Sequence, residues 1–413
     1  MQPNLTQLFR TEYSKLVAVL CKHFGLTNIQ LAEDIVSDTF IAAAETWGKK
    51  GLPDNPTAWL YTVAKNKTRD QMRRKKVFQE KIQVDLQHGA ADSTDMELDF
   101  STQHIQDSQL QMIFAICHPS VSEEAQIGLA LRILCGFGID EIADAFLANK
   151  ATINKRLFRA KEKLRKANIA IAFPEEKELP GRLTTVLRTL YLLFNEGYYS
   201  ISSNKSLRKD LCLEAMRLNY LLTQYETTDQ PQVNALLSLM CFHASRFEAR
   251  LDDSGVFVLY EDQDTSRWDD DLKRQGEHYL NRSSTGEAFT KYHLEAAIAF
   301  WHTEKEDTTE KWEQILQLYN YLLQIEYSPA AALNRTYALA KAESREKAIA
   351  EAKKIDLASY HFYHCLLAEL YGKEEPQKAL AHLNTALNLA KSEGDKQLIQ
   401  RKIDVLNKRH PES

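Results

Sequence analysis

Residues 138–166 of the 413-residue chain read GIDEIADAFLANKATINKRLFRAKEKLRK. The pattern predicts two short helices joined by a tight turn. The second helix is strongly basic, with eight cations and only Glu162 as an anion between Lys150 and Lys166. Such a pair is typical of a helix-turn-helix that binds DNA. Leu147 stands where many of these turns have glycine, which weakens the turn signal, and a solvated basic helix is the alternative.

The basic helix is predicted to have two distinct faces. Apolar residues at steps of four, three and four predict one buried stripe, made of Ile153, Leu157, Ala160 and Leu164. Small Ala143 on the preceding helix would allow the two helices to cross closely. Other side chains lie off the stripe, near the start of the helix, where a recognition helix enters a major groove. They are Asn154, Lys155, Phe158 and Arg159.

A second basic stretch, residues 55–76, reads NPTAWLYTVAKNKTRDQMRRKK. Asn55 followed by Pro56 predicts a helix start, because asparagine caps helices and proline suits the first helical position. The side chains expected to face a core are Leu60, Val63 and Ala64. The other faces offer cations for phosphates, an amide, and an aromatic ring that suits an unstacked base. The alternative is a solvated basic helix end.

Composition favours an all-α chain. Glycine and proline number only 14 and 10, so helices with short loops are expected. The length fits two to four domains, and a hydrophobic content of 44% suffices for their cores. We expect no signal peptide and no membrane span, because neither apolar pattern is present. The six cysteines are scattered without a CxxC pair, which predicts reduced thiols in a cytoplasm and no metal site.

Charge divides the chain into segments. The net charge is +5 over residues 1–76, −6 over 77–107, +3 over 108–170 and −7 over 171–413. The acidic segment lacks helical periodicity and is rich in Asp, Ser, Thr and Gln, so it is predicted to be a linker. Two prolines bracket a further boundary at 173–180. The predicted domains are therefore 1–76, 108–170 and 175–413.

The order of these motifs resembles a known family. Residues 32–43 (AEDIVSDTFIAA), Trp47 and the 55–76 stretch resemble region 2 of bacterial sigma factors, and residues 138–166 resemble region 4. No obvious region 3 lies between them, as in the extracytoplasmic-function (ECF) type. Residues 190–200, 214–218, 261–269 and 332–335 resemble the extension of a subgroup that carries a long C-terminal helical domain similar to tetratricopeptide (TPR) repeats, and in that subgroup Leu147 also replaces the turn glycine.

The resemblance implies a non-enzymatic transcription factor without cofactor. Its partners would be core RNA polymerase, through the β′ clamp helices and the β flap, and promoter DNA. The polymerase contacts would come from Glu33, Asp34 and Asp38. The acidic linker would thread near the RNA exit path.

Two sets of residues would contact the promoter. The loop 51–55 and Asn66 match the positions that hold a base flipped from the minus-ten element. The full minus-ten set is Asn55, Trp59, Lys65, Asn66, Arg69 and Arg73. At the minus-thirty-five element, Asn154, Lys155, Phe158 and Arg159 would read bases, and Lys150, Arg156, Lys161 and Lys163 would hold phosphates.

The C-terminal segment carries a weak repeat. KAIA at 347–350 and KALA at 378–381 are offset by 31 residues, and Leu366, Ala379 and Ala386 fit a TPR pattern, whereas Ile355 does not. His361 and His364 lack a third partner at metal-binding spacing. We therefore expect a TPR-like helical array that modulates the sigma factor or binds a protein or peptide.

Two polar motifs in this segment have alternative interpretations. The motifs are FNEGYYS at 194–200 and EDQDTSRWD at 261–269. Capping and internal pairing are expected for Asn195, Glu196, Asp262, Asp264 and Arg267. A regulatory contact is expected from Asn195, Glu196, Tyr198 and Tyr199. The rival hypotheses for the whole chain are a scaffold or signal-binding protein built on the array, and an enzyme built on Glu196 and Asp262.

Overall fold

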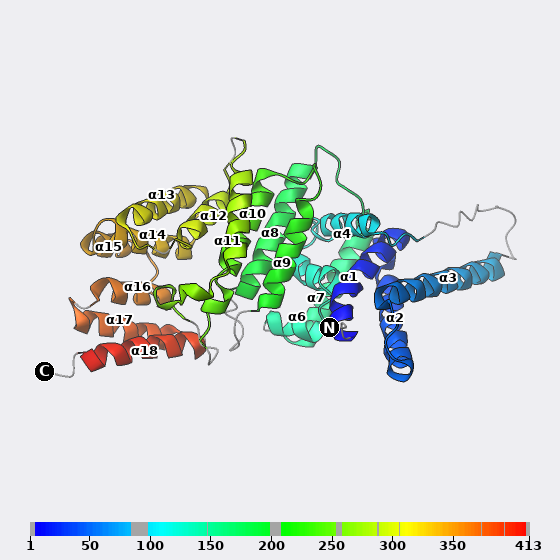
Figure 1. The fold of residues 1–413 in the computed structure, drawn as a ribbon, viewed down its shortest axis with the longest axis horizontal. Helices are drawn as coiled ribbons and strands as arrows, with labels where there is room; N and C mark the ends of the chain where they lie inside the picture. The colour runs from blue at the N-terminus through cyan, green and yellow to red at the C-terminus, as the bar shows by residue number, and fades with distance from the viewer. Residues whose placement is uncertain are drawn as a thin grey trace. The chain divides into compact units, whose positions relative to one another are not determined.

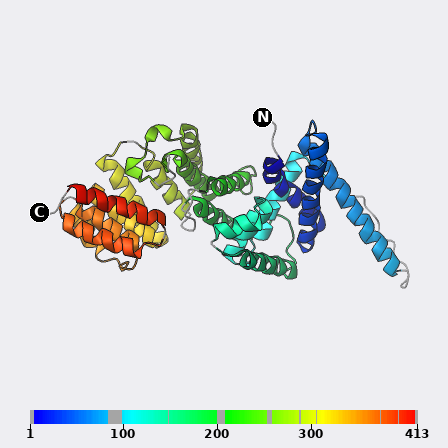
Figure 2. The same cartoon turned by 90° about the horizontal axis from the view of Figure 1, so that it is seen from below.

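The computed structural model contains only helices as regular elements in the part it describes, in agreement with the predicted all-α class (Figures 1 and 2). It describes residues 5–83, 98–146, 148–198, 208–252, 258–286, 289–304, 306–372, 374–391 and 393–409. Within these residues, no helix combines the length and apolar character of a membrane span. Contacts divide the chain into two compact units, Met1–Leu192 and Leu193–Ser413.

The first unit begins with three long helices, coloured blue in Figure 1. They are α1 (Leu5–Phe24), α2 (Ile29–Lys50) and α3 (Pro56–Gln83). The predicted start of α3 is confirmed, because Asn55 Oδ1 accepts the Ala58 N–H at 3.0 Å. Leu60 and Ala64 are fully buried, and Val63 is only half-buried. The helix extends past residue 76, into the range predicted as linker.

Five more elements follow in the first unit: α4 (Thr102–Ile116), α5 (Glu123–Leu129), the π-helix η2 (Ala130–Leu134), α6 (Ile139–Ala145) and α7 (Lys150–Lys166). The start of α4 also lies in the range predicted as linker. Residues 84–97 and Leu147 lie outside the described residues. Asn149 caps α7 by accepting the Thr152 N–H at 2.8 Å. The predicted apolar stripe of α7 is buried throughout, with Ile153, Leu157, Ala160 and Leu164 each at most 3% exposed.

The helices of the first unit share one core. Helix α1 packs against α2, α3, α4 and η2, and η1 (Leu26–Asn28), just before α2, packs against α7. Leu16 and Leu20 of α1 and Leu110 of α4 are completely buried. Gln109 Nε2 donates to Ser14 Oγ across this core at 3.4 Å. The two basic stretches of the sequence therefore belong to one packed body.

Helix α8 (Leu179–Tyr198) crosses from one unit to the other. Its first half packs on the first unit, where Arg182 donates to the Phe114 carbonyl oxygen and buried Thr189 donates to Gln126 Oε1 at 2.9 Å. Pro180 lies in the first turn of α8, a position that proline favours. The proline-bracketed stretch at 173–180 thus leads into a helix, and the units divide farther along, between Leu192 and Leu193.

The second unit starts at the end of α8 and continues through α9 (Lys209–Leu222), α10 (Pro231–Ala244), η3 (Phe247–Ala249), η4 (Tyr260–Asp262), η5 (Thr265–Arg267), α11 (Asp270–Ser283) and α12 (Lys291–Trp301). Helix α10 packs against α9, α11 and α12. Gly197 permits a close approach of α8 to the start of α9. A Cβ at Gly197 would lie 2.7 Å from Cys212 Sγ and 2.8 Å from the Arg208 carbonyl oxygen.

Helices pack in sequence along the rest of the second unit. They are α13 (Thr309–Ile325), α14 (Pro329–Ala342), α15 (Arg345–Ala352), α16 (His361–Tyr371), α17 (Pro376–Leu389) and α18 (Glu393–Arg409). Each helix packs against the next in the chain, and α16 packs on α14 as well. Ala348, Ala379 and Ala386 are completely buried. Small side chains of this kind let neighbouring helices approach closely.

Candidate nucleic-acid and polymerase surfaces

Helix α7 presents a polar face to solvent opposite its buried stripe. The four residues predicted to read bases, Asn154, Lys155, Phe158 and Arg159, are all exposed. Phe158 has 66% of its surface exposed, which is unusual for a large apolar side chain. A phenyl ring in that position can contact a thymine methyl group, and Arg159 can donate to a guanine edge. The face therefore has the groups that direct base readout requires.

The cations of α7 have different surroundings. Lys155, Arg159 and Lys163 are exposed. Lys150 Nζ forms an exposed ion pair with Asp140 at 3.0 Å, and the Arg156 guanidinium lies 5.5 Å from the Phe146 ring centroid. Exposed pairs of this type contribute little stability, so Lys150 is available to a phosphate at small cost.

Lys161 and Glu33, predicted to contact a phosphate and the polymerase, bind each other in the structure. Glu33 on α2 is 4% exposed in its side chain; Lys161 Nζ donates to its Oε2, and Arg132 Nε donates to its Oε1 at 3.1 Å. Arg132 also donates to the Phe137 carbonyl oxygen at 3.1 Å and lies 5.6 Å from the Tyr13 ring centroid. In this arrangement Glu33 does not face a polymerase and Lys161 does not face a phosphate.

The groups next to the Glu33 cluster are shielded from solvent, and this burial changes their pKa values. Burial raises the pKa of the Tyr13 hydroxyl, and the Glu33 carboxylate raises it further. Burial likewise raises the pKa of the Cys21 thiol. A carboxylate in such surroundings needs its two cations, since an unpaired buried charge is strongly unfavourable.

The other two carboxylates of the predicted polymerase surface are accessible. Asp34 and Asp38 are exposed on α2, and Asp34 Oδ1 accepts a hydrogen bond from Gln30 Nε2 at 3.1 Å. They lie four residues apart and so share a helix face. A basic partner surface can reach both without any change in the first unit.

Helix α3 carries a polar row. Asn66, Arg69 and Arg73 are exposed and follow helical spacing along one side, while Lys65 is half-buried. Trp59 is half-buried, with its ring edge-on to Trp47 at 5.2 Å. Asn55 is exposed, but its side-chain oxygen already caps the helix. Asn66 is therefore the amide best placed to meet a base.

The FNEGYYS motif of the second unit is mostly internal. Tyr198 is 1% exposed, and its ring lies 4.6 Å from that of His243 and 3.8 Å from the Arg250 guanidinium. Asn195 and Glu196 are half-buried, and Tyr199 lies outside the described residues. Tyr198, one of the four residues predicted to make a regulatory contact, is thus a core residue of its own unit.

The second polar motif caps helices in part. Asp264 Oδ1 accepts the Ser266 N–H at 2.9 Å, and these hydrogen bonds lower the pKa of Asp264. Asp269 caps α11 by accepting the Leu272 N–H at 2.9 Å. Asp262 and Arg267 are exposed. The capping interpretation is correct for Asp264.

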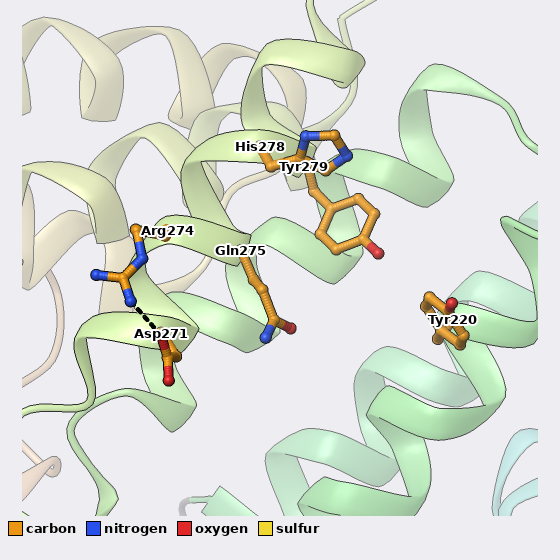
Figure 3. Close-up of a pocket in the computed structure, with 6 residues that line it drawn as sticks. All are labelled: Tyr220, Asp271, Arg274, Gln275, His278 and Tyr279. Atoms are coloured by element: carbon orange, nitrogen blue, oxygen red, sulfur yellow. Dashed lines mark hydrogen bonds and ion pairs between the residues drawn. The ribbon is translucent and has the colours of Figure 1, made fainter.

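A shallow hollow of about 580 Å³ lies on the second unit between α9 and α11. Figure 3 shows its lining residues, Tyr220, Asp271, Arg274, Gln275, His278 and Tyr279, with Asp271 and Arg274 paired to each other. Burial raises the pKa of the Tyr279 hydroxyl in this hollow, and Tyr220 raises it further. No group of three or more His, Cys, Asp or Glu side chains that could hold a metal ion occurs in the described part of the chain.

Comparison with known proteins places the chain in a family. Residues 8–77 match sigma-70 region 2, and residues 182–284 match a family of unknown function, DUF6596. The "Uncharacterized protein R00370" of Rhizobium meliloti (strain 1021) is 33% identical over 347 residues, which cover 82% of this chain and 81% of that protein. The chain belongs to the same family as this protein. No solved structure matches the chain.

The two matched segments align with the structure as follows. The sigma-70 region 2 match covers most of α1, all of α2 and α3 as far as residue 77, so the predicted resemblance of the N-terminal helices to region 2 is confirmed. The DUF6596 match runs from α8 to α11 and includes both polar motifs. The family of unknown function thus carries the FNEGYYS and EDQDTSRWD residues.

Proposed function

We propose that the chain is a sigma factor of the ECF type that binds core RNA polymerase and directs transcription from a two-part promoter. The sigma-70 region 2 match carries the proposal, and the exposed basic face of α7 supports it. The protein acts in the bacterial cytoplasm as a binding factor without catalysis or cofactor. The role of the C-terminal residues is regulation from within the same chain.

The two promoter elements are read by different physical means. Asn66 on α3 accepts or donates to a base flipped out of the melted minus-ten strand, while Arg69 and Arg73 contact its phosphates. On α7, Asn154, Lys155, Phe158 and Arg159 read the minus-thirty-five duplex through its major groove. Phosphate contacts supply salt-dependent affinity and base contacts supply specificity.

The described structure corresponds to a closed state of such a factor. Elements centred at minus ten and minus thirty-five lie about 25 base pairs apart, which is about 85 Å at 3.4 Å per base pair. Helices α2 and α7, of 22 and 17 residues, are in direct contact through Glu33 and Lys161. They are about 33 and 26 Å long at 1.5 Å per residue, too short to span that separation while joined. The Glu33 contacts therefore open when promoter DNA binds.

Polymerase binding promotes this opening. Asp34 and Asp38 are accessible in the closed state and make the first contacts with the basic clamp surface. Glu33 joins them once Lys161 and Arg132 release it, so the polymerase competes with the chain's own cations for one carboxylate. Two of the three predicted polymerase-binding residues thus act first and the third acts after opening.

The test of the proposed function is transcription with purified core RNA polymerase on fragmented genomic DNA, followed by sequencing of RNA 5′ ends. The proposal expects start sites that share two upstream elements. Asn66→Ala should reduce promoter melting, and Arg159→Ala should cost about 1–3 kcal/mol of discrimination at one base pair of the upstream element. Lys22→Ala, outside both reading faces, is the control. Transcripts without a shared upstream element would overturn the proposal.

The alternative function, a scaffold built on the helices of residues 309–409, is decided by the same experiment. A scaffold produces no promoter-specific transcript with core polymerase. A shortened chain used to probe the extension should end after Leu192 rather than near Phe173, because the first half of α8 packs on the first unit through Arg182 and Thr189. We expect the extension to support transcription, and equal activity without it would exclude an intramolecular role.

A further inference from the structure

Two polar motifs that are distant in the sequence meet at Arg246, in the turn after α10. Arg246 Nη2 donates to the hydroxyl oxygen of Tyr198 from FNEGYYS at 3.3 Å. The guanidinium carbon lies 5.5 Å from the ring centroid of Tyr260, the residue that precedes EDQDTSRWD. Arg246 is only 8% exposed. Neither the match to sigma-70 region 2 nor the reading surfaces account for this buried cation.

The described residues supply no ion-pair partner for the charge of Arg246. In the described residues Arg246 forms no ion pair, and its Nε–H has no hydrogen-bond partner. Lys311, 2% exposed, donates to the Tyr260 hydroxyl oxygen at 3.1 Å and to the Glu304 carbonyl oxygen at 3.0 Å. Asp307, four residues before Lys311, accepts from Trp312 Nε1 and pairs with Lys341, and Lys311 helps to lower its pKa from a greater distance. Two buried cations thus lie against the Tyr260 ring, and within the described residues neither forms an ion pair with a carboxylate.

Other unpartnered polar atoms gather around the same ring. Buried atoms without a hydrogen-bond partner include Trp268 Nε1 and His302 Nδ1, besides Arg246 Nε. Their rings lie 6.4 Å and 5.1 Å from that of Tyr260. Native proteins rarely leave several buried polar atoms unsatisfied in one place unless water, an ion or a ligand completes them.

The histidines beside this cluster cannot supply the missing negative charge. Burial, together with the charges of Arg246 and Lys311, lowers the pKa of His302 to about 3. His243 has its pKa lowered well below the usual value by burial and by Arg246, Arg250 and His302. Both rings are neutral at pH 7. The two histidines therefore do not offset the charges of Arg246 and Lys311.

We propose that this cluster, defined as Tyr198, Arg246, Tyr260, Trp268, His302 and Lys311, binds a small organic carboxylate. A guanidinium matches a planar carboxylate in geometry, and an ammonium and N–H donors can complete its oxygens. The Tyr260 and Trp268 rings supply an apolar surface for the carbon skeleton. Four of its six residues lie in the segment that matches the family of unknown function, and His302 and Lys311 follow it. The site does not depend on the sigma-factor proposal.

The test is thermal unfolding of the full chain in sodium benzoate, sodium acetate, sodium phosphate and sodium chloride at equal ionic strength and pH 7.5. A ligand at ten times its dissociation constant lowers the unfolding constant about elevenfold, because it binds only the folded state. We expect this shift for benzoate or acetate and not for phosphate or chloride. An equal shift with all four salts, or no shift with any, overturns the proposal.

Two variants assign the effect to the cluster. Arg246→Met removes the charge at similar volume, so it should abolish the carboxylate shift without lowering the unfolding temperature in chloride. Arg267→Met, an exposed arginine of the neighbouring motif, should keep the shift. A carboxylate shift that survives in Arg246→Met, or a strong loss of stability in chloride, means that Arg246 is only a structural hydrogen-bond donor.

Hydrogen exchange of the unaltered chain tests the same site even if Arg246→Met fails to fold. Hydrogen exchange of the unaltered chain should slow in benzoate at residues 243–250 and 258–268, and not at residues 361–389 of the same unit. Uniform slowing, or none, contradicts the assigned site.

Discussion

Both units bury cationic side chains, but the groups that surround these cations differ between the two units. In the first unit, Arg132 and Lys161 share the buried Glu33 carboxylate, and the group is closed upon itself. In the second unit, Arg246 and Lys311 lie around Tyr260, and no ion pair to a carboxylate is found for them in the part that the structure describes. A buried charge is tolerated only when something compensates it. We therefore propose that the first cluster is an internal latch that a partner opens, whereas the second is suited to a ligand that enters it.

The largest expected effect comes from removing the shared anion of the first cluster. Glu33→Gln leaves two partly buried cations without their carboxylate and should destabilise the packing of α2 on α7 by about 3 kcal/mol. Urea unfolding of the full chain, with hydrogen exchange read at α2 and α7, measures this loss. Asp34→Asn, next to it and exposed, should change stability by less than about 0.5 kcal/mol. Similar results for both variants would show that the cluster is not a latch.

The second cluster should show itself in the pH dependence of stability. An unfolded histidine has a pKa of about 6.5, and the folded value for His302 is about 3. Below pH 6.5, His302 therefore binds a proton in the unfolded state but stays neutral in the folded state until the pH approaches 3. Stability of the second unit should fall by about 1.4 kcal/mol per pH unit for this residue as the pH drops from about 6.5 toward 3.

His243 should add to the same slope, since its folded pKa is also lowered. Urea unfolding of the unaltered chain at pH 7, 6 and 5 measures the total, and His302→Gln should remove part of it. A bound carboxylate would favour the protonated rings, so the slope should also become shallower in benzoate. A flat profile between pH 7 and 5 would contradict the burial of both rings.

The smallest expected effect separates two lysines on one helix. Lys161→Met removes one of the two cations from Glu33 and should cost about 1 kcal/mol, because Arg132 still holds the carboxylate. Lys163→Met should leave stability unchanged and reduce the salt dependence of DNA binding by about one unit, as expected for a phosphate contact. Equal stability of the two variants would contradict the different burial of these side chains.

Local features of the fold were predictable from the sequence. The Asn55–Pro56 start of α3 and the buried stripe of α7 follow from capping chemistry and helical periodicity, which involve neighbouring residues only. The exposure of Asn154 and Phe158 follows from the same stripe. The proline-bracketed stretch was misleading, because Pro180 suits the first turn of a helix as well as a loop.

The two charge clusters were not predictable in the same way. Glu33 lies 99 residues from Arg132 and 128 from Lys161, so no spacing along the chain connects them. Arg132 stands within an apolar run, LALRILCGFGI, whose sequence does not indicate an acidic partner. Arg246 stands in the turn after an apolar helix, and its contacts with Tyr198 and Tyr260 depend on how three distant segments pack. The sequence pointed to functional roles for Glu33 and Lys161, but only the fold shows which charged side chains contact each other.

The most direct test of the account is fluorescence resonance energy transfer between dyes attached at Thr27 in η1 and at Lys166, the last residue of α7. Both residues are exposed, and each lies a few residues from a member of the Glu33–Lys161 pair. The free protein should show high transfer, since η1 packs against α7. Addition of core RNA polymerase and a promoter selected by transcription should lower the transfer strongly, because the two elements lie about 85 Å apart at 3.4 Å per base pair. High transfer that persists in the promoter complex would contradict both the closed state and the reading of two elements by these helices.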